Sequence, residues 1–224
     1  MRFLPTNRAV WLRLLALFAF MALLGYVNRE QCAFVFSRVP VFYHYLRYSP
    51  QEGDVVFQSL PHGELVDAIE GITHSPYSHC GVVLRNDKNE WVVIESISSV
   101  HETPLFLWIF RGRGANFTAY RLDPKYSGCI PDFKKNLLGY SGRSYDFDYD
   151  MTNDRSLYCS DLVYLAFEKV SGEKLGQLQK LGDLDWKPFE AFIKSEQHGA
   201  LPLDRAMITL ASLAAAYQLH EVYP

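Results

Sequence analysis

The segment Tyr158-Cys159-Ser160-Asp161-Leu162-Val163-Tyr164 places a thiol at the predicted start of a helix. The residues after the cysteine recur at helical spacing and are apolar: Leu162, Val163, Ala166, Phe167 and Val170. Ser171-Gly172 then gives a typical helix stop. The N-terminus of a helix carries free N–H groups and partial positive charge, which favour a thiolate and can bind a developing oxyanion. We therefore expect an activated Cys159 at the beginning of a helix over residues 159–170.

A histidine that could act on this thiol lies much earlier, in Ser75-Pro76-Tyr77-Ser78-His79-Cys80-Gly81. Residues 80–84 and 91–97 read as two strands, and the polar turn between them, residues 86–89, predicts a hairpin. In that hairpin Glu95 falls near His79, or one residue off register, where it can orient the imidazole and stabilise its charge. The candidate catalytic trio is thus His79, Glu95 and Cys159.

Further candidates surround this trio. Tyr145 could offer its hydroxyl to an oxyanion beside the Cys159 backbone N–H, although aromatic packing explains it equally well. We expect Tyr77, Tyr158 and Asp161 to contact the oxyanion or the substrate, with capping of backbone donors as the alternative for Asp161. A buried small hydrophobe describes most single cysteines, and a strand-edge histidine is often structural. The rival bases, all in loop-like surroundings, are His62, His74 and His101.

The chain has 224 residues, enough for one domain with an extension, and it is 49% hydrophobic, which argues against disorder. Residues 1–30 carry four arginines against one glutamate, a sum of +3, so the net charge of −3 leaves −6 for the remainder. An acidic body of this kind argues against nucleic acid as a partner.

The N-terminal region is basic and then apolar, with no charge in residues 14–27. This run is short for a membrane-spanning helix but suits a secretory signal, and no clean cleavage site follows it. We expect residues 1–30 to be a hydrophobic helix that serves as a signal anchor or signal peptide. The arginines predict an inner-membrane protein with an extracytoplasmic (periplasmic) domain, or a secreted one if the signal is cleaved. A buried N-terminal helix of a cytosolic protein is the alternative.

Residues 31–50 form an aromatic connector, and residues 51–224 the domain. Strands are expected at residues 55–57 and 117–122 besides the hairpin, and helices at residues 64–72, 132–140, 186–194 and 207–218. Strands thus dominate the first half and helices the second, which indicates an α+β fold. No glycine-rich phosphate loop follows a strand and no CxxC spacing occurs, so we expect no cofactor and no metal. Whether Cys32, Cys80 or Cys129 form a disulfide is left open.

The ordered motifs GDVVFQ, SPYSHCGVV, WVVIES, ETPLFLWIFR, GRSYDFDY and YCSDLVY resemble the YiiX/YebB-like cysteine hydrolases. These are circularly permuted papain-like (NlpC-type) enzymes, and the resemblance covers residues 50–170 and the tail LPLDRAMITLASL. It implies a small antiparallel sheet packed on helices, with Cys159 as nucleophile, His79 as base and Glu95 as third residue. Tyr145 resembles the tyrosine that precedes the nucleophile in the wider superfamily.

The sequence departs from that family in three places. Cys80 stands where a valine or isoleucine is usual, and Asp161 where a glutamate is common. The tail reads MITL where relatives often have a proline after the threonine, which leaves its contribution to the pocket in doubt. None of these changes removes a predicted catalytic group.

These patterns predict a thiol-dependent amidase or peptidase that works through an acyl-enzyme. The alternative on the same scaffold is a membrane-associated lipid acyltransferase or phospholipase, which an apolar tunnel beside Cys159 would favour. A short polar cleft with an acidic group would favour peptides instead. The third possibility is a non-catalytic binding module. Expected partners are a peptide, amide or acyl-lipid substrate, and the membrane through the N-terminal segment.

Overall fold

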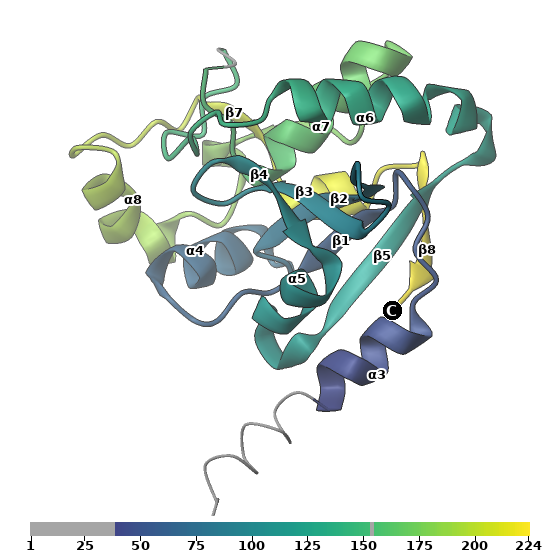
Figure 1. The fold of residues 1–224 in the computed structure, drawn as a ribbon. Coiled ribbons are helices and arrows are strands. Elements are labelled where there is room, and N and C mark those ends of the chain that lie inside the picture. Colours follow the sequence, from purple (N-terminus) through teal and green to yellow (C-terminus); the bar gives the residue numbers. More distant parts are fainter. Residues whose placement is uncertain (1–38, 153–154) are drawn as a thin grey trace, which may run out of the picture.

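The structure, a computed structural model, describes residues 39–152 and 155–224. The predicted N-terminal hydrophobic helix of residues 1–30 and the first part of the connector, residues 31–38, lie outside the described residues. Within the described part a six-stranded antiparallel sheet has the order β4-β3-β2-β1-β5-β8 (Figure 1). Its strands are β1 Val55–Gln58, β2 His79–Arg85, β3 Trp91–Ser96, β4 Val100–Pro104, β5 Phe117–Leu122 and β8 Leu219–Tyr223.

Helices cover both faces of this sheet. One face packs against α6 (Ile130–Gly139) and α7 (Cys159–Ser171), and the other against α3 (Val39–Arg47) and α5 (Leu105–Arg111). The central strands β1 and β2 are buried nearly throughout, which explains why they read as apolar runs rather than as alternating patterns. The expected α+β architecture, an antiparallel sheet packed on helices, is confirmed.

A side lobe lies at one end of the sheet (Figure 1). It consists of α4 (Glu64–Thr73), α8 (Glu190–Glu196) and a two-stranded sheet of β6 (Leu178–Lys180) and β7 (Ala206–Ile208). The short helix α9 (Leu210–Ala214) follows β7 directly and joins the core. Short 3-10 turns complete the structure at Arg113–Ala115, Pro124–Cys129, Leu181–Asp183 and Lys187–Phe189.

The predicted hairpin and the helices over residues 64–72, 132–140 and 159–170 are present, with ends shifted by at most a few residues. The helix expected over residues 186–194 begins at Glu190, after a 3-10 turn. The single helix expected over residues 207–218 is wrong: the segment contains the end of β7, then α9, and leads into β8. Thr209 caps α9 by accepting a hydrogen bond from the Ser212 N–H at 3.1 Å. A nearly all-apolar run carries no period that separates strand from helix.

Both ends of the described chain meet at β5. His44 on α3 contacts the Tyr223 hydroxyl on β8 at 2.8 Å. Beside them the buried Asp54 accepts hydrogen bonds from the Tyr48 hydroxyl at 2.6 Å and from the Arg121 guanidinium at 2.7 and 2.9 Å. None of the helices in residues 39–152 and 155–224 is both long and apolar enough to cross a membrane.

Candidate active site

Cys159 is the first residue of α7, and its side chain is only 3% exposed. The helix begins there because Tyr158 has an extended backbone, with φ −86° and ψ 171°. The flanking side chains fix this start in place. The Tyr158 hydroxyl accepts a hydrogen bond from the Ile208 N–H, and the Ser160 hydroxyl donates one to the Ile208 carbonyl, both at 2.9 Å. The thiol therefore sits where α7, the core sheet and β7 meet.

Helix α7 packs on β2, and this brings His79 and Cys80 to the thiol. Hydrogen bonds from the Cys80 thiol, and then from the positively charged His79, hold the pKa of Cys159 well below its ordinary value, although burial raises it. The Cys80 backbone N–H also donates to the Cys159 sulfur. Burial lowers the pKa of His79, but its hydrogen bonds to Cys159 and Glu95 outweigh this and raise it to about 9. The arrangement favours a thiolate–imidazolium pair.

The second nitrogen of the imidazole is held by Glu95. His79 Nε2 lies 2.5 Å from Glu95 Oε2, and both side chains are buried. This leaves Nδ1 for the thiol. The β2–β3 register pairs Val82 with Ile94, so His79 and Glu95 are diagonal neighbours on one face of the sheet. Gly81 is the next residue of β2 on the same face and lies opposite Glu95, and a Cβ there would meet Glu95 Cβ at 3.2 Å and Val93 Cγ1 at 2.4 Å. The missing side chain thus lets the two groups meet.

Glu95 is in turn fixed from α5 and β4. It binds Arg111 of α5 in an ion pair and accepts a hydrogen bond from the Thr103 hydroxyl at 2.6 Å. Burial raises the pKa of Glu95, but His79, followed by Arg111, lowers it to about 2. The carboxylate is therefore ionised at any physiological pH and holds the imidazolium by charge as well as by geometry.

The structure separates the other predicted site residues into two groups. Tyr145 and Tyr158 line the cavity that contains Cys159, and the Tyr145 hydroxyl is 3.2 Å from that of Tyr149. Asp161 is fully buried in the first turn of α7, and Tyr77 bonds Thr118 of β5 at 3.1 Å through its hydroxyl. Neither Asp161 nor Tyr77 is among the residues that line the cavity.

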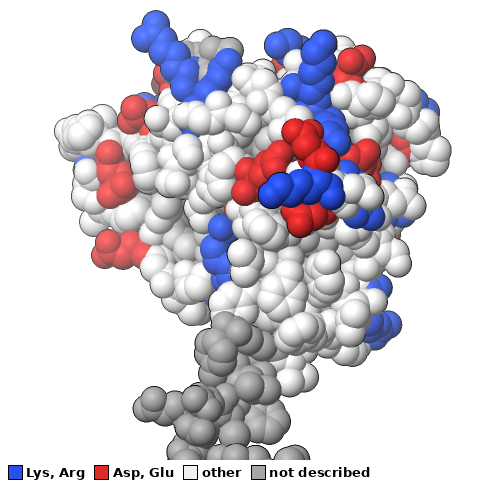
Figure 2. Space-filling model, viewed as in Figure 1, with Lys and Arg blue, Asp and Glu red and all other residues white. Residues whose placement is uncertain are grey.

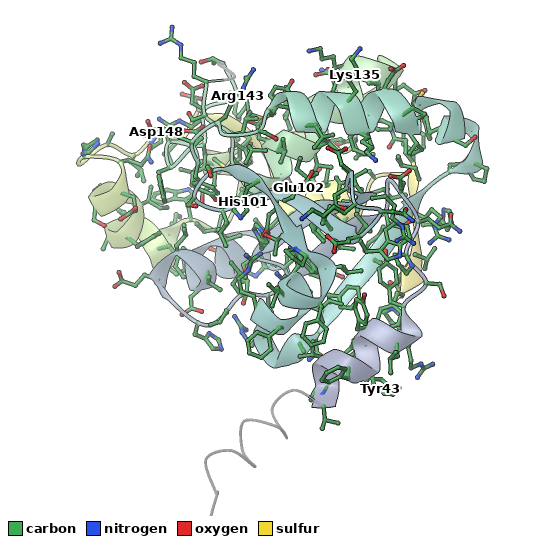
Figure 3. The ribbon with its side chains drawn as sticks, viewed as in Figure 1. Tyr43, His101, Glu102, Lys135, Arg143 and Asp148 are labelled. Carbon is green, nitrogen blue, oxygen red and sulfur yellow. The ribbon has the colours of Figure 1, made fainter. Side chains whose placement is uncertain are left out.

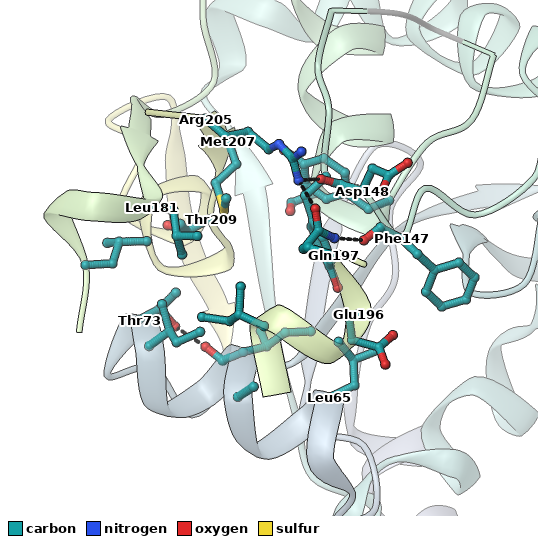
Figure 4. Close-up of a pocket in the computed structure, with 18 of the residues that line it drawn as sticks. Leu65, Thr73, Phe147, Asp148, Leu181, Glu196, Gln197, Arg205, Met207 and Thr209 are labelled. Atoms are coloured by element: carbon teal, nitrogen blue, oxygen red, sulfur yellow. Dashed lines mark hydrogen bonds between the residues drawn. The ribbon is translucent and has the colours of Figure 1, made fainter. Parts of the chain in front are cut away.

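The cavity runs from Cys159 into the side lobe, between α4, α8 and β7 (Figure 4). The space within its lining is about 900 Å³, a figure that includes open solvent at the mouth. Its walls are mainly aliphatic and aromatic, with Leu65, Ala68, Ile69, Ile72, Leu181, Leu184, Phe192, Ile193, Met207 and Ile208 among them. Polar groups gather at one side, where Arg205 binds the Gln197 side chain and the Asp148 carbonyl. An extended apolar group fits this space better than a charged one does.

Three contributors to the site were not predicted. Arg111 appeared only within an apolar run, Thr103 carried no signal, and Cys80 was noted only as a departure from the family pattern. Of the rival histidines, His62 and His74 are exposed and bind Asp67 and Asp185 in the side lobe. His101 on β4, labelled in Figure 3, has its Nε2 4.0 Å from Glu95 Oε1 and is partly exposed.

Comparison with known proteins identifies the family. YiiX of Escherichia coli (strain K12) is 29% identical over 201 residues, covering 87% of this chain and 95% of YiiX. The crystal structure of YiiX from Escherichia coli O157:H7, described as a metalloprotein, superposes with a TM-score of 0.73 at 28% identity. That match covers 79% of this chain and all of the other. Residues 49–223 match a family model, and this range is well over half of the sequence. The chain therefore belongs to the permuted papain-like amidases of the YaeF/YiiX, C92 family.

Proposed function

We propose that this chain is a thiol hydrolase that cleaves amides through Cys159, His79 and Glu95. The observation that carries the proposal is the buried His79–Glu95 pair beside Cys159, together with the lowered pKa that Cys80 and His79 give to this thiol. Its electrostatics favour a charged pair over a neutral thiol, which is the state a nucleophile needs. A structural cysteine does not need a base whose other nitrogen is fixed by a buried carboxylate.

In the proposed reaction the Cys159 thiolate attacks the carbonyl carbon of the amide. The backbone N–H of Cys159 and the Tyr145 hydroxyl bind the resulting oxyanion. His79 gives its Nδ1 proton to the amine, which leaves, and a thioester to Cys159 remains. Water then attacks the thioester while His79 takes up a proton, and the acid is released with the thiolate restored. Glu95 keeps the imidazole oriented throughout and stays ionised.

The metalloprotein description of the YiiX structure prompts a check of the donor groups. Within the described ranges, no three His, Cys, Asp or Glu side chains gather in a way that could hold a metal ion. His79 and Glu95 are already bound to each other, and Cys159 has His79 and Cys80 as partners. These residues do not make a fitting metal site, and no step of the proposal passes through one.

A second candidate function is transfer or hydrolysis of a lipid acyl group on the same thiol. The specific observation in its favour is the cavity, whose apolar walls begin at Cys159. Amide and ester cleavage share the thioester intermediate, so they differ only in the leaving group and in what occupies the cavity. Asp148, Glu196 and Arg205 also line the cavity, and these charged residues would favour a peptide substrate over an acyl chain.

The proposal can be tested with activated acyl probes on the full chain. Acetyl and dodecanoyl p-nitroanilides and p-nitrophenyl esters would be incubated with the protein, and the acyl adduct would be located by mass spectrometry. We expect a thioester on Cys159, no turnover by Cys159→Ala, and normal turnover by the matched control Cys129→Ser. Persistent turnover by Cys159→Ala would contradict the mechanism. Faster acylation by the dodecanoyl probes would favour the lipid candidate, and the reverse order would favour small amides.

The third possibility, a binding module without catalysis, has a separate outcome. An inert buried thiol reacts slowly with iodoacetamide below pH 7, whereas a thiolate of lowered pKa reacts fast. Slow alkylation of Cys159 in the folded protein, together with no acyl adduct from any probe, would indicate a binding protein without catalytic activity.

A further inference from the structure

The exposed apolar side chains are gathered on one part of the surface. Most of the large apolar residues that are well exposed in the described chain lie on two adjacent helices, α3 and α5. We call them together the α3–α5 face: Val39, Phe42, Tyr43, Tyr45, Leu46, Leu107 and Phe110. Leu46 is 78% exposed and Val39 is 54% exposed. Apolar patches of this kind, beyond the scattered residues of an ordinary surface, mark interaction sites.

The α3–α5 face is a continuous surface. Phe42 and Tyr45 of α3 both contact Phe106 of α5, with ring centroids 5.1 and 5.7 Å apart. The opposite sides of the two helices hold them to the core through Val41 and Trp108, which are at most 1% exposed. The exposed residues are therefore additional to those that stabilise the fold. Tyr43 extends outward from α3 at the edge of the molecule (Figure 3).

The charges on this face are of one sign. Residues 39–47 and 105–113 contain three arginines and no aspartate or glutamate. Figure 2 shows uncharged and basic side chains around α3 and the acidic ones farther away. Arg111 and Arg113 are bound to Glu95 and Glu70, whereas Arg47 packs on the Tyr43 ring, 5.2 Å from its centroid. Since Arg111 and Arg113 are paired with glutamates, Arg47 supplies the positive charge of this face. An aromatic face with a cation and no carboxylate of its own suits an anionic lipid surface.

The sequence that precedes α3 adds a second, independent observation. The uncharged run of residues 14–27 is followed by residues 28–38 and then directly by α3. A fully extended linker of that length reaches about 40 Å at most. If residues 14–27 enter a bilayer, as expected from their composition, α3 is the element of the domain held nearest to it.

We propose that the α3–α5 face rests on the surface of a lipid bilayer. Phe42, Leu46 and Leu107 would enter the boundary between headgroups and acyl chains, while Tyr43 and Arg47 would contact the headgroups. The inference concerns where the domain lies and does not depend on the proposed hydrolase activity.

The test uses the full chain reconstituted into vesicles of phosphatidylcholine and phosphatidylglycerol that contain a phospholipid with a photoactivatable acyl chain. After illumination, adducts are mapped by proteolysis and mass spectrometry. We expect adducts on peptides covering residues 39–47 and 105–111. The double variant Phe42→Glu with Leu46→Glu should lose most of the α3 adduct. The matched variant Tyr217→Glu, at a residue 75% exposed beyond the other end of β8, should keep it.

Three results would overturn the proposal. Adducts confined to residues 1–38 would mean that the anchor alone meets lipid. Cross-links between α3 of two molecules would mean that a second copy covers the face. Protection of residues 39–47 from hydrogen exchange in lipid-free full chain, together with no lipid adduct there, would mean that residues 1–38 cover it.

Discussion

At the scale of single residues, Cys80 is the neighbour that most strongly affects the thiol. Its side chain and its backbone N–H both donate to Cys159, and it is fully buried beside it. Burial, and then the hydrogen bond to Cys159, raise the pKa of Cys80 well above the ordinary value. Cys80 is therefore the proton-bearing partner, and Cys159 carries the negative charge.

Replacing Cys80 by Val removes the thiol donor and keeps an apolar side chain. We expect the pKa of Cys159 to rise, so the pH at which its alkylation by iodoacetamide reaches half the maximal rate should move upward by about one unit. At pH 9 the variant and the natural protein should react alike. Mass spectrometry of the Cys159 peptide across a pH series measures this. Cys129→Ser is the control, and an unchanged profile in Cys80→Val would show that the Cys80 thiol contributes nothing.

In the proposed mechanism Arg111 is a positioning residue, since it touches Glu95 rather than the reacting atoms. Arg111→Met should raise the pKa of Glu95 and weaken the charge that holds His79, so Cys159 alkylation at pH 6 should fall. Losing one partner of a buried carboxylate also costs about 3 kcal/mol of unfolding free energy. Arg111→Lys keeps the positive charge, so it should restore part of the alkylation rate and part of the unfolding free energy.

Arg113→Met supplies the matched control, because Arg113 binds Glu70 away from the thiol. It should lower stability in urea unfolding without altering the pH profile of alkylation. Identical profiles for the Arg111 and Arg113 variants would reduce Arg111 to a purely structural role.

The sequence could predict that Cys159, His79 and Glu95 lie together, because local patterns place each of them. The polar turn after Arg85 sets the hairpin and hence puts Glu95 near His79. Gly172 ends helix α7, and the apolar residues before it recur at helical spacing back to Cys159, where the helix begins. Arg111 and Thr103 could not be found in this way, since their contacts with Glu95 depend on how α5 and β4 lie against β3.

At the scale of elements, β2 has the most demanding position. It pairs with β1 and β3, supplies His79 and Cys80, and must pass close to β3 at Gly81. A Cβ at residue 81 would meet the Ile94 carbonyl oxygen at 2.8 Å as well as the Val93 side chain. Backbone cannot yield as a flexible side chain can, so the two strands would have to separate.

Gly81→Ala should lower the unfolding free energy by roughly 2 kcal/mol through overpacking, measured by urea denaturation. It should also slow Cys159 alkylation at pH 6, because β2 carries His79 away from Glu95. Gly63→Ala is the control, since a Cβ there has no neighbour within 4 Å. Equal stability for the two variants would contradict the close approach of β2 and β3.

Helices and strands whose own sequence has a clear hydrophobic repeat could be predicted. Those that form because of the elements packed beside them could not. Helix α7 and the β2–β3 hairpin carry clear internal patterns. β4, α5 and β8 carry weak ones: α5 is the apolar run LFLWIFR, and β8 is a strand because β5 lies beside it. The cavity was equally out of reach, since its walls come from segments far apart in sequence.

At the scale of the whole molecule, the site joins two layers. Cys159 belongs to the core between the sheet and α7, whereas Trp108 and the Glu95–Arg111 pair lie on the α5 side. The ring of His79 approaches Trp108, with centroids 6.4 Å apart, and the same ring reaches the thiol. The imidazole therefore connects the two cores.

The pH dependence of the unfolding free energy should reveal the contribution of the ionised Glu95, which binds His79. The folded pKa of Glu95 is about 2, below the ordinary 4.5, so its ionisation contributes stability that is complete above about pH 4.5. That contribution is lost as the pH falls toward 2. In Glu95→Gln the unfolding free energy should be lower at pH 6 and should fall less steeply between pH 4.5 and 2. Urea midpoints across this range test it, and parallel curves for both proteins would contradict it.

The link that His79 makes between the layers has a consequence for newly made chains. A polypeptide with only one layer assembled has an ordinary, mostly protonated thiol, because either the imidazole or its carboxylate is out of place. Under the proposed mechanism the thiolate can attack carbonyl groups only once both layers are assembled, so incompletely folded chains do not become acylated on Cys159.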